Sequence, residues 1–388
     1  MTCCVLANVG MLFLFRYSVL KTILVPLGMS FYVLQALGYV IDVYRKELTP
    51  EKNLMKYTVF LFFFPTIMSG PIQRGQQILP QIKEGRDFDY QKAHRGLYLL
   101  LYGYLLKIVV ANPLGSMVNF AYDDYTGMPG ATLLWATILY GIQLYCDFAG
   151  YSALAIGTGK LLGFDIKENF KQPYFAVSIK EFWNRWHISL STWLRDYLYI
   201  PLGGNRKGKF RKYVNLMVTF LISGLWHGTG AGFLIWGGLH GIYQILGDCI
   251  RGRGKKQTLQ GLPRILCGVF TFLLVDFAWL FFRAESLEQA VGILKSIFCD
   301  FGLKEMTYYG SYLLGGTPFE LLFMFACIGV VFLIDFLHEK NISIENVIMC
   351  RTNIAVRWIG YIVCTLLILL VIVQNYGEAA SKFIYTRF

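Results

Sequence analysis

Charged residues are what this 388-residue sequence has least of. Only 15% of its residues are Asp, Glu, Lys or Arg, whereas soluble domains carry about 25%. The mean hydropathy is +0.48 and 55% of the residues are hydrophobic, which is more apolar surface than one water-soluble core can bury. The composition therefore excludes a soluble enzyme, a disordered chain and a DNA-binding domain. It predicts an all-α polytopic membrane protein.

Patterns that bind metals or form disulfide frameworks are also missing. The nine cysteines are odd in number, and no pair has the spacing of metal ligands. Neither HExxH nor CxxC occurs, so we expect no metal and no bound cofactor. The N-terminus has no basic region before its apolar stretch and no small-residue cleavage site, which favours a membrane segment over a signal peptide. Because repeats and linkers are absent too, we expect one multi-pass domain over 1–388.

Long runs without charge mark the expected membrane helices. The clearest runs are 22–41, 57–73, 126–146, 213–247, 321–334 and 358–377. Two further segments, 97–122 and 265–282, each hold one interior charge, Lys107 and Asp276. Together they predict nine to eleven membrane segments, nearly all helical because lipid leaves the backbone few other hydrogen-bond partners.

The net charge of +12 is concentrated in loops. The loops 74–95, 160–212 and 251–264 are basic, whereas Asp123 and Asp124 lie in an acidic loop. The positive-inside rule puts the basic loops in the cytoplasm and the acidic loop outside. The excess charge therefore describes orientation against anionic membrane lipid, and we expect no nucleic-acid partner.

The charge-free run 213–247 has basic residues on both sides, so it must leave and re-enter the same face. A glycine-rich break at 228–232 divides it into two helices of about 15 residues, which rise about 22 Å. Because a hydrocarbon core is ~30 Å thick, we expect a hairpin that turns within the membrane or near its far face. His227 directly precedes the turn and is expected in the membrane interior.

An amphipathic helix is predicted inside the basic loop 160–212. Ser178 and Glu181 fit a capping box, and the helix that follows is expected to end near Pro201. Its Trp-rich arc predicts that it lies on the inner membrane surface, with His187 near the edge of that arc. For His187 and His227 two interpretations stay open, hydrogen-bonded structural side chains or a shared site.

A second set of polar residues follows one face of the helix expected around 126–146. Gln143, Asp147 and Tyr151 recur every four residues, and they either pin helix packing or line a polar tunnel. We expect His240 and Lys107 to be structural.

The basic run 206–212 also has two interpretations. It is most simply a topology anchor, and otherwise Arg206, Lys207 and Lys209 contact the phosphates of an anionic donor.

Several motifs make the sequence similar to a known family. They are YCDFAGYSALAIGTGKLLGF from Tyr145, RWHISLS and LYIPLGG in the basic loop, and ISGLWHGTGAG around His227. This pattern resembles the membrane-bound O-acyltransferase (MBOAT) family, and within it the bacterial alginate O-acetyltransferase membrane subunits. The resemblance covers about 25–244. Family members usually carry more N-terminal helices, so we expect such helices to be missing here.

The resemblance implies a ring of helices around a tunnel that joins the cytoplasmic and outer faces. The family's active-site histidine maps to His227, its second functional position maps to His187, and Trp226 becomes a tunnel candidate. We expect His227 to act as general base or transient acyl carrier, and His187 as its orienting or oxyanion-stabilising partner. The implied donor is cytoplasmic acetyl-CoA. The implied acceptor is an extracytoplasmic polysaccharide, with an extracytoplasmic acetyltransferase as partner, at the bacterial plasma membrane.

Two other functions compete with this one. Within the family, the rival is D-alanyl transfer to teichoic acid, and the LYIPLGG run favours the alginate-like branch. From another class, a non-catalytic transporter or channel subunit would explain a tunnel and a basic inner face. It would explain less well why two histidines converge, and the inverted repeat typical of many transporters is not found in the sequence.

Overall fold

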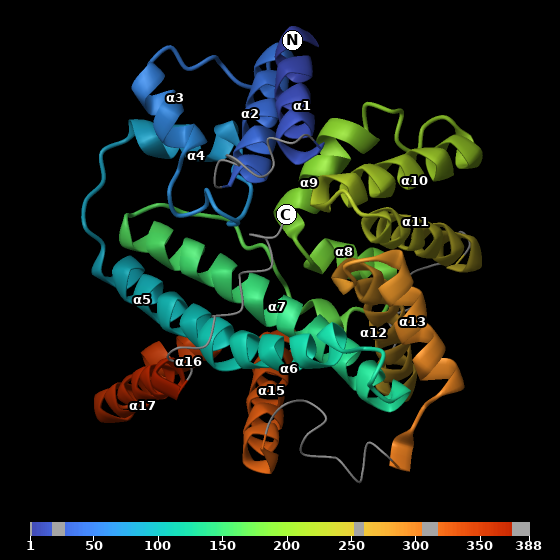
Figure 1. Ribbon diagram of the computed structural model, residues 1–388. Coiled ribbons are helices and arrows are strands. Elements are labelled where there is room, and N and C mark those ends of the chain that lie inside the picture. The colour runs from blue at the N-terminus through green and yellow to red at the C-terminus, as the bar shows by residue number, and fades with distance from the viewer. Residues whose placement is uncertain (1, 18–27, 252–259, 305–316, 375–388) are drawn as a thin grey trace.

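The computed structural model describes residues 2–17, 28–251, 260–304 and 317–374, and every regular element within these ranges is a helix (Figure 1). The all-α prediction is confirmed for this part of the chain. In chain order the elements are α1 (Thr2–Tyr17), α2 (Met29–Tyr44), α3 (Leu54–Leu61), α4 (Gly75–Lys83), α5 (Tyr90–Tyr104), η2 (Leu105–Ala111), α6 (Asn112–Asp123), α7 (Gly130–Leu161), η3 (Pro173–Phe175), α8 (Ile179–Arg185), α9 (Ile188–Leu194), η4 (Arg195–Tyr199), α10 (Gly208–His227), α11 (Ala231–Arg251), α12 (Gly261–Arg283), α13 (Leu287–Cys299), α15 (Pro318–Glu339), α16 (Ile344–Arg351) and α17 (Ile354–Gln374).

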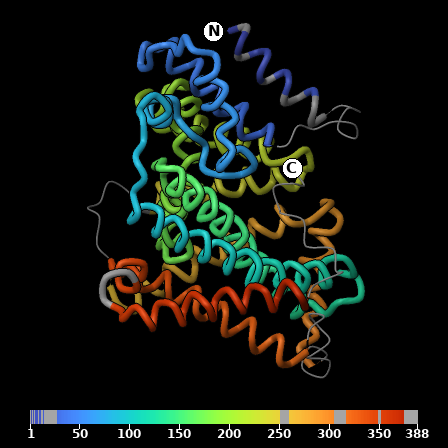
Figure 2. Tube along the Cα trace, turned by 90° about the vertical axis from the view of Figure 1, so that its left-hand side faces the viewer, coloured from blue at the N-terminus to red at the C-terminus, as the bar shows by residue number. Residues whose placement is uncertain are grey.

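The 32-residue helix α7 is the buried centre of the fold, with α5 and α6 running along it (Figure 1). Two glycine pairs let the backbones of α5 and α7 approach closely. A Cβ added at Gly96 would lie 2.7 Å from the Gly157 carbonyl oxygen, and one at Gly103 would lie 2.8 Å from that of Gly150. Lipid supplies no hydrophobic driving force for helix association. Close packing at small residues stabilises a helix crossing of this kind instead. Figure 2 shows α17 lying outside this pair, against α5 and η2.

Four of the described helical stretches are long and apolar enough to cross a membrane: Tyr90–Asp123, Gly261–Arg283, Pro318–Glu339 and Ile354–Gln374. They coincide with four of the predicted segments, and the total of nine to eleven stays a prediction. The membrane helix expected over 57–73 is wrong, because helix α3 ends at Leu61 and turns follow. Pro65 and Pro71 account for this, since proline lacks an amide hydrogen and its ring clashes with the preceding turn.

The single helix expected after Ser178 is also wrong, because it is broken at His187. Helix α8 ends at Arg185 and α9 begins at Ile188. The backbone groups at the break bond elsewhere: Lys171 donates to the Arg185 carbonyl at 2.9 Å, and Ile188 donates to the Asn169 carbonyl at 3.0 Å. The N-cap is confirmed, since the Ser178 side chain accepts from the Glu181 amide.

The Trp-rich arc of this region does not lie on the surface as expected. The side chains of Phe182, Trp183 and Trp186 belong to the largest hydrophobic core, around α7, and Trp193 packs on α2. Aromatic side chains of this size bury large areas, so packing inside the protein outweighs an interfacial position. The two short helices therefore carry His187 into the interior.

The hairpin is confirmed as two helices, α10 and α11, that meet at residues 228–230. They are longer than expected, with 20 and 21 residues, and each rises about 30 Å because the basic flanks are helical too. The turn packs on the end of α12, where Gly232 lies against the Phe281 carbonyl. The Arg283 guanidinium at that end donates to Asn119 and lies 4.0 Å from Asp123. The turn therefore lies at the end of the bundle predicted to be extracytoplasmic.

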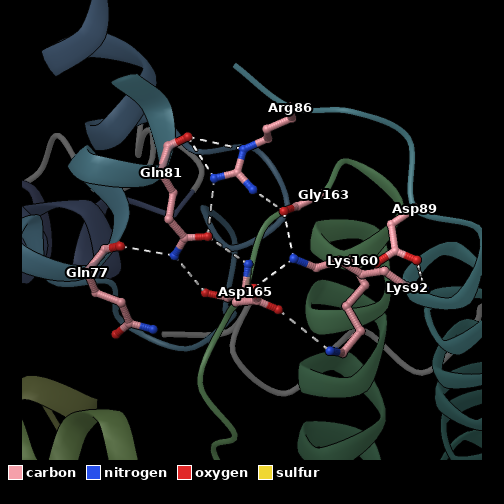
Figure 3. Close-up of polar contacts among 8 residues, drawn as sticks. All are labelled: Gln77, Gln81, Arg86, Asp89, Lys92, Lys160, Gly163 and Asp165. Atoms are coloured by element: carbon pink, nitrogen blue, oxygen red, sulfur yellow. Dashed lines mark hydrogen bonds and ion pairs between the residues drawn. The ribbon is translucent and has the colours of Figure 1, made fainter. Parts of the chain in front are cut away.

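Polar contacts tie α4, the segment after it and the start of α5 to the end of α7 and the segment that follows it (Figure 3). Gln81 and Asp165 exchange two hydrogen bonds, from the Asp165 amide to Gln81 Oε1 at 2.8 Å and from Gln81 Nε2 to the Asp165 carbonyl at 3.0 Å. Lys92 Nζ bonds the Gly163 carbonyl at 2.8 Å and Asp165 Oδ2 at 2.7 Å. Arg86 stacks on Phe164 and donates to the Gln81 carbonyl. We call Gln81, Arg86, Lys92, Lys160, Gly163 and Asp165 the Asp165 cluster.

Candidate active site

The two histidines singled out in the sequence both lie next to the Trp226 ring. The Trp226 ring is 4.7 Å from the His227 ring and 6.4 Å from the His187 ring, measured between centroids. Both imidazoles are almost completely buried. The structure therefore brings together residues from α10 and from the break between α8 and α9. The shared site is favoured over two unrelated structural histidines.

His187 is held by its backbone as well as by its side chain. It is the N-cap of α9 and adopts the left-handed conformation, with φ 43° and ψ 54°. For a residue with a Cβ this conformation costs roughly 1–2 kcal/mol, and such strain is concentrated at functional sites. Its Nδ1 lies 3.3 Å from Asn169 Oδ1, and the Phe148 ring packs edge-on at 4.7 Å.

The protonation of His187 follows from these contacts. Asn169 Oδ1 also accepts the Ser189 amide at 3.0 Å, so this atom is the amide oxygen and His187 Nδ1 carries the hydrogen. Helices α8 and α9 have seven residues each, too short to span a membrane, and burial lowers the pKa of His187 between them to about 3. The ring is therefore neutral near pH 7, with Nε2 as the hydrogen-bond acceptor.

His227 ends α10 inside an aromatic cage. The rings of Trp236 and Phe282 lie 5.1 Å and 5.2 Å from it, both edge-on. Trp226 links this cage to α2, because its Nε1 donates to the Ser30 carbonyl at 3.3 Å. Side chains of α10, α11 and α12 thus surround His227, and Trp226 ties this cage to α2.

The face of α7 that carries Gln143, Asp147 and Tyr151 is turned inward. Gln143 and Asp147 are buried and Tyr151 is partly buried. Asp147 forms an ion pair with Lys107 of η2, which supplies the partner that an intramembrane carboxylate needs. The pair favours a role in helix packing for Asp147, and the lining of a tunnel by these residues stays a prediction.

The basic residues Arg206, Lys207 and Lys209 are exposed at the opposite end of α10. Lys209 and His227 are 18 positions apart on this helix, which is about 27 Å. The structure therefore does not bring these basic residues to His227.

Sequence reasoning missed two residues that the structure places at the site. Asn169 and Phe148 contact His187, and Asn169 precedes it by only 18 residues, in a segment with no periodicity to mark it. His240, expected to be structural, lies beside Trp236 at 5.1 Å and accepts a hydrogen bond from Trp183 Nε1 at 3.3 Å.

The fold and the site define a polytopic, all-helical membrane protein with a histidine pair buried near a hairpin turn. The chain belongs to the membrane-bound O-acyltransferase family, whose family model matches residues 46–288 and so includes both histidines. The probable alginate O-acetylase AlgI of Azotobacter vinelandii is 43% identical over 72% of this chain and 55% of its own length. The peptidoglycan O-acetyltransferase of Helicobacter pylori is 35% identical over 75% of this chain and 60% of its own length.

A more distant relative is the teichoic acid D-alanyltransferase of Streptococcus thermophilus, which is 31% identical over 61% of this chain and 62% of its own length. The chain thus spans little more than half the length of the curated relatives it matches.

Proposed function

We propose that this protein is a membrane O-acetyltransferase that moves acetyl groups from cytoplasmic acetyl-CoA toward an extracytoplasmic polysaccharide. The observation that carries the proposal is the meeting of two buried histidines around Trp226 in a chain of this family. The names of the alginate and peptidoglycan relatives support acetyl as the acyl group and a polysaccharide as the acceptor.

In the proposed reaction, an acceptor hydroxyl oxygen attacks the thioester carbonyl carbon, and the carbon–sulfur bond breaks. As general base, His227 takes the hydroxyl proton and returns it to the leaving thiolate. As transient acyl carrier, a ring nitrogen of His227 instead attacks the thioester carbon, and the ring gives its proton to the leaving thiolate. The acceptor hydroxyl then takes the acetyl group from that nitrogen and returns a proton to the ring. His187 orients this exchange. Because His187 Nδ1 donates to Asn169, its Nε2 can accept a hydrogen bond but cannot donate one. The geometry therefore supports the orienting role over oxyanion stabilisation.

The proposal also assigns the surroundings of the site. Acetyl-CoA reaches it from the basic face, with Arg206, Lys207 and Lys209 as contacts for its phosphates. Gln143, Asp147, Tyr151 and Trp226 line the path between the two faces. The chain sits in the bacterial plasma membrane, and an extracytoplasmic acetyltransferase acts as partner for the final transfer.

The rival functions have less support. The D-alanyltransferase relative is less similar than the O-acetylases, which favours acetyl over D-alanyl transfer. Membership of an acyltransferase family favours an enzyme over a transporter or channel subunit.

The test is the acetyl content of the cell-envelope polysaccharide in cells with and without the gene, complemented by wild type or H227A. We expect wild type to restore acetylation and H227A to leave it at the level of the deletion, with both proteins equally abundant in membranes. Full acetylation by H227A at normal abundance would overturn the proposal.

A further inference from the structure

The guanidinium group of Arg185, the last residue of α8, belongs to an ionic network of two arginines and two glutamates. It binds both carboxylate oxygens of Glu339 at the end of α15, from Nη1 to Oε2 at 2.6 Å and from Nη2 to Oε1 at 3.1 Å. Glu181, one helical turn earlier on α8, accepts from Nη2 at 2.6 Å. Arg264 near the start of α12 donates to Glu339 Oε1 at 2.5 Å. The network therefore joins α8, α12 and α15.

The pair of Arg185 and Glu339 has the geometry of a strong interaction. Two parallel N–H···O bonds between a guanidinium and a carboxylate fix the relative orientation of both groups, which a lysine ammonium does not do. The two side chains are 18% and 16% exposed, so water and salt screen this pair less than a fully exposed ion pair. The pair is therefore suited to holding the end of α8 in one position.

Arg185 is also bonded to the chain segment that carries Asn169. Its Nη1 donates to the Gln172 carbonyl at 3.3 Å, and its own carbonyl accepts from the Lys171 amide at 2.9 Å. Asn169 Oδ1 in this segment is the hydrogen-bond partner of the His187 ring, at 3.3 Å. Arg185 thus binds, on one side, the segment that orients the imidazole and, on the other side, a carboxylate of α15.

Two residues bonded or close to Arg185 have a strained backbone. Gln172 has φ 41° and His187 has φ 43°, both in the left-handed region. A residue with a Cβ keeps this conformation only where the surrounding structure imposes it. Helices α8 and α9, with seven residues each, have little stability of their own with which to impose it. Arg185 bonds Gln172 directly and lies two positions before His187, so its anchoring supplies part of the constraint.

The anchor comes from a distant part of the chain. Glu339 ends a helix that begins at Pro318, beyond residue 288, where the match to the family model ends. Its partners Arg185 and Arg264 both belong to basic loops that are predicted to be cytoplasmic. The cytoplasmic end of α15 is therefore connected, through one side chain, to the break that carries His187.

We propose that Glu339 and Arg185 are positioning residues for the proposed acetyl transfer. Glu339 holds the guanidinium of Arg185, and Arg185 holds the Asn169 segment and the α8–α9 break, so that the His187 ring keeps its place next to Trp226. The inference rests on the proposed function for the reaction in which His187 takes part. Because the pair limits the conformations of His187 and does not touch the substrate, its loss should slow the chemical step without weakening substrate binding.

The alternative is an ion pair that only stabilises the fold. Its loss would then reduce the amount of folded protein and leave the activity of each folded molecule unchanged. Arg264 provides the matched control, because it binds the same carboxylate from α12 rather than from the segments around His187. R264Q therefore removes a bond to Glu339 and keeps the connection between Glu339 and Arg185.

The activity test uses the purified full chain in lipid nanodiscs, with acetyl-CoA as donor and mannuronate oligosaccharides as acceptor. E339Q removes the charge of the carboxylate and keeps its shape, whereas R185K keeps the charge of the guanidinium and loses its two parallel bonds. We expect each variant to lower kcat about tenfold and to leave KM for acetyl-CoA within about twofold. R264Q should keep kcat within about twofold of wild type.

The double variant R185K/E339Q tests whether the two residues act as one unit. Its kcat should be no lower than that of R185K alone, because both substitutions disrupt the same interaction. Losses that multiply in the double variant would show that the two side chains act independently, and would overturn the proposal. Should R185K fail to fold, E339D takes its place, since it keeps the charge and should retain several-fold more activity than E339Q.

Amide hydrogen exchange of the same proteins gives a readout that does not depend on activity. E339Q and R185K should speed the exchange of the Ile188 and Ser189 amides several-fold, because these amides bond Asn169 across the break. R264Q should exchange there as wild type does. An E339Q variant with wild-type kcat, or an R264Q variant that matches E339Q in kcat and in exchange, would overturn the positioning role.

The two readouts also separate this inference from the proposed function. If wild type transfers no acetyl group, the proposed function fails, and exchange alone decides whether Glu339 holds the break at His187. Faster exchange in E339Q but not in R264Q would then support the proposal, and equal exchange in wild type and E339Q would overturn it. Acetyl transfer that requires His227 but is unchanged in E339Q would keep the function and remove the inference.

Discussion

Two groups of polar side chains in this protein differ in how far their hydrogen bonds are satisfied. In the Asp165 cluster, backbone carbonyls, the Gln81 amide and the lysines satisfy one another, and the Asp165 side chain is 67% exposed (Figure 3). Inside the helix bundle, by contrast, Trp236, His240 and Asp276 are more than nine-tenths buried, and Nε1 of Trp236, Nε2 of His240 and Oδ1 of Asp276 have no hydrogen-bond partner in the described part of the chain. Interactions that are complete hold a chain in place. Incomplete interactions in the interior leave hydrogen-bonding capacity unused.

The two regions also differ in backbone conformation. No residue with a side chain in the Asp165 cluster has a left-handed conformation, whereas His187 in the histidine site has one. The backbone next to His187 is held by the hydrogen bond from the Ile188 amide to the Asn169 carbonyl. The strained residue therefore belongs to the histidine site, beside Trp226 at the end of α10. We expect substitutions there to affect activity more than stability, and substitutions in the Asp165 cluster to do the reverse.

The largest expected effect is that of His227→Ala. Loss of a general base typically costs 10²–10⁴-fold in rate, and we expect a loss of about 10³-fold in acetyl transfer by the purified protein. The unfolding temperature should change little, because the aromatic cage of Trp226, Trp236 and Phe282 remains.

The matched control for His227→Ala is His94→Ala. His94 bonds Tyr361 at 3.2 Å, outside the contacts of the histidine site, and its loss should leave acetyl transfer within about twofold. Equal losses of activity for the two variants would end the distinction between the histidine site and the rest of the fold.

Two variants at His187, H187A and H187N, separate the effect of the backbone conformation from the effect of the side chain. Both replacements remove the imidazole, but Asn tolerates the left-handed conformation and its Nδ2 can still donate to Asn169 Oδ1. We therefore expect H187A to lose about 10²-fold in rate and H187N to retain several-fold more activity than H187A. Membrane abundance should stay normal for H187N. An H187N variant as inactive as H187A would show that the ring itself, rather than an oriented donor to Asn169, carries the role.

Stability should depend on pH through His187. Its pKa is lowered from 6.5 to about 3 by burial, so the unfolded chain binds more protons than the folded protein between these values. The contribution is complete above pH 6.5 and is lost as the pH falls toward 3. At pH 5.5 this predicts a loss of about 1.4 kcal/mol from this group, visible as a lower unfolding temperature of wild type. H187N should show a smaller decrease between pH 7.5 and 5.5, and an identical decrease would contradict the assignment.

Much of the fold could be predicted from the sequence because lipid imposes simple rules. The apolar segments 97–122, 265–282, 321–334 and 358–377 predicted the four spans, and the glycine break at 228–232 predicted the hairpin. The helix after Ser178 was predicted wrongly because periodicity continues through His187, and nothing local signals the bonds from Asn169 and Lys171 that break it. Those bonds depend on a segment brought in by the end of α7.

Part of the candidate site could also be predicted from the sequence. His227 and His187 could be chosen from polarity within apolar segments and from the family resemblance. Asp276 was visible as the one charge in its predicted segment, but a single sequence does not say whether an intramembrane acid has a partner. Asp147 and Asp276 look alike in sequence. The structure separates them, because Lys107 pairs with the first and no described residue bonds Oδ1 of the second.

The smallest expected effect is that of a substitution in the Asp165 cluster, where the hydrogen bonds are complete. Asp165→Asn removes the ion pairs to Lys92 and Lys160 but keeps the backbone bonds to Gln81. Exposed ion pairs contribute about 0–1 kcal/mol, so the free energy of unfolding should fall by less than about 1 kcal/mol, and by less still at high salt. Acetyl transfer should be unchanged within about twofold, since a complete, solvent-exposed cluster has no bonding capacity left for a substrate. A D165N variant that folds normally but loses tenfold or more in transfer would place the cluster on the path of the donor, and the contrast between satisfied and unsatisfied polar groups would no longer separate scaffold from site.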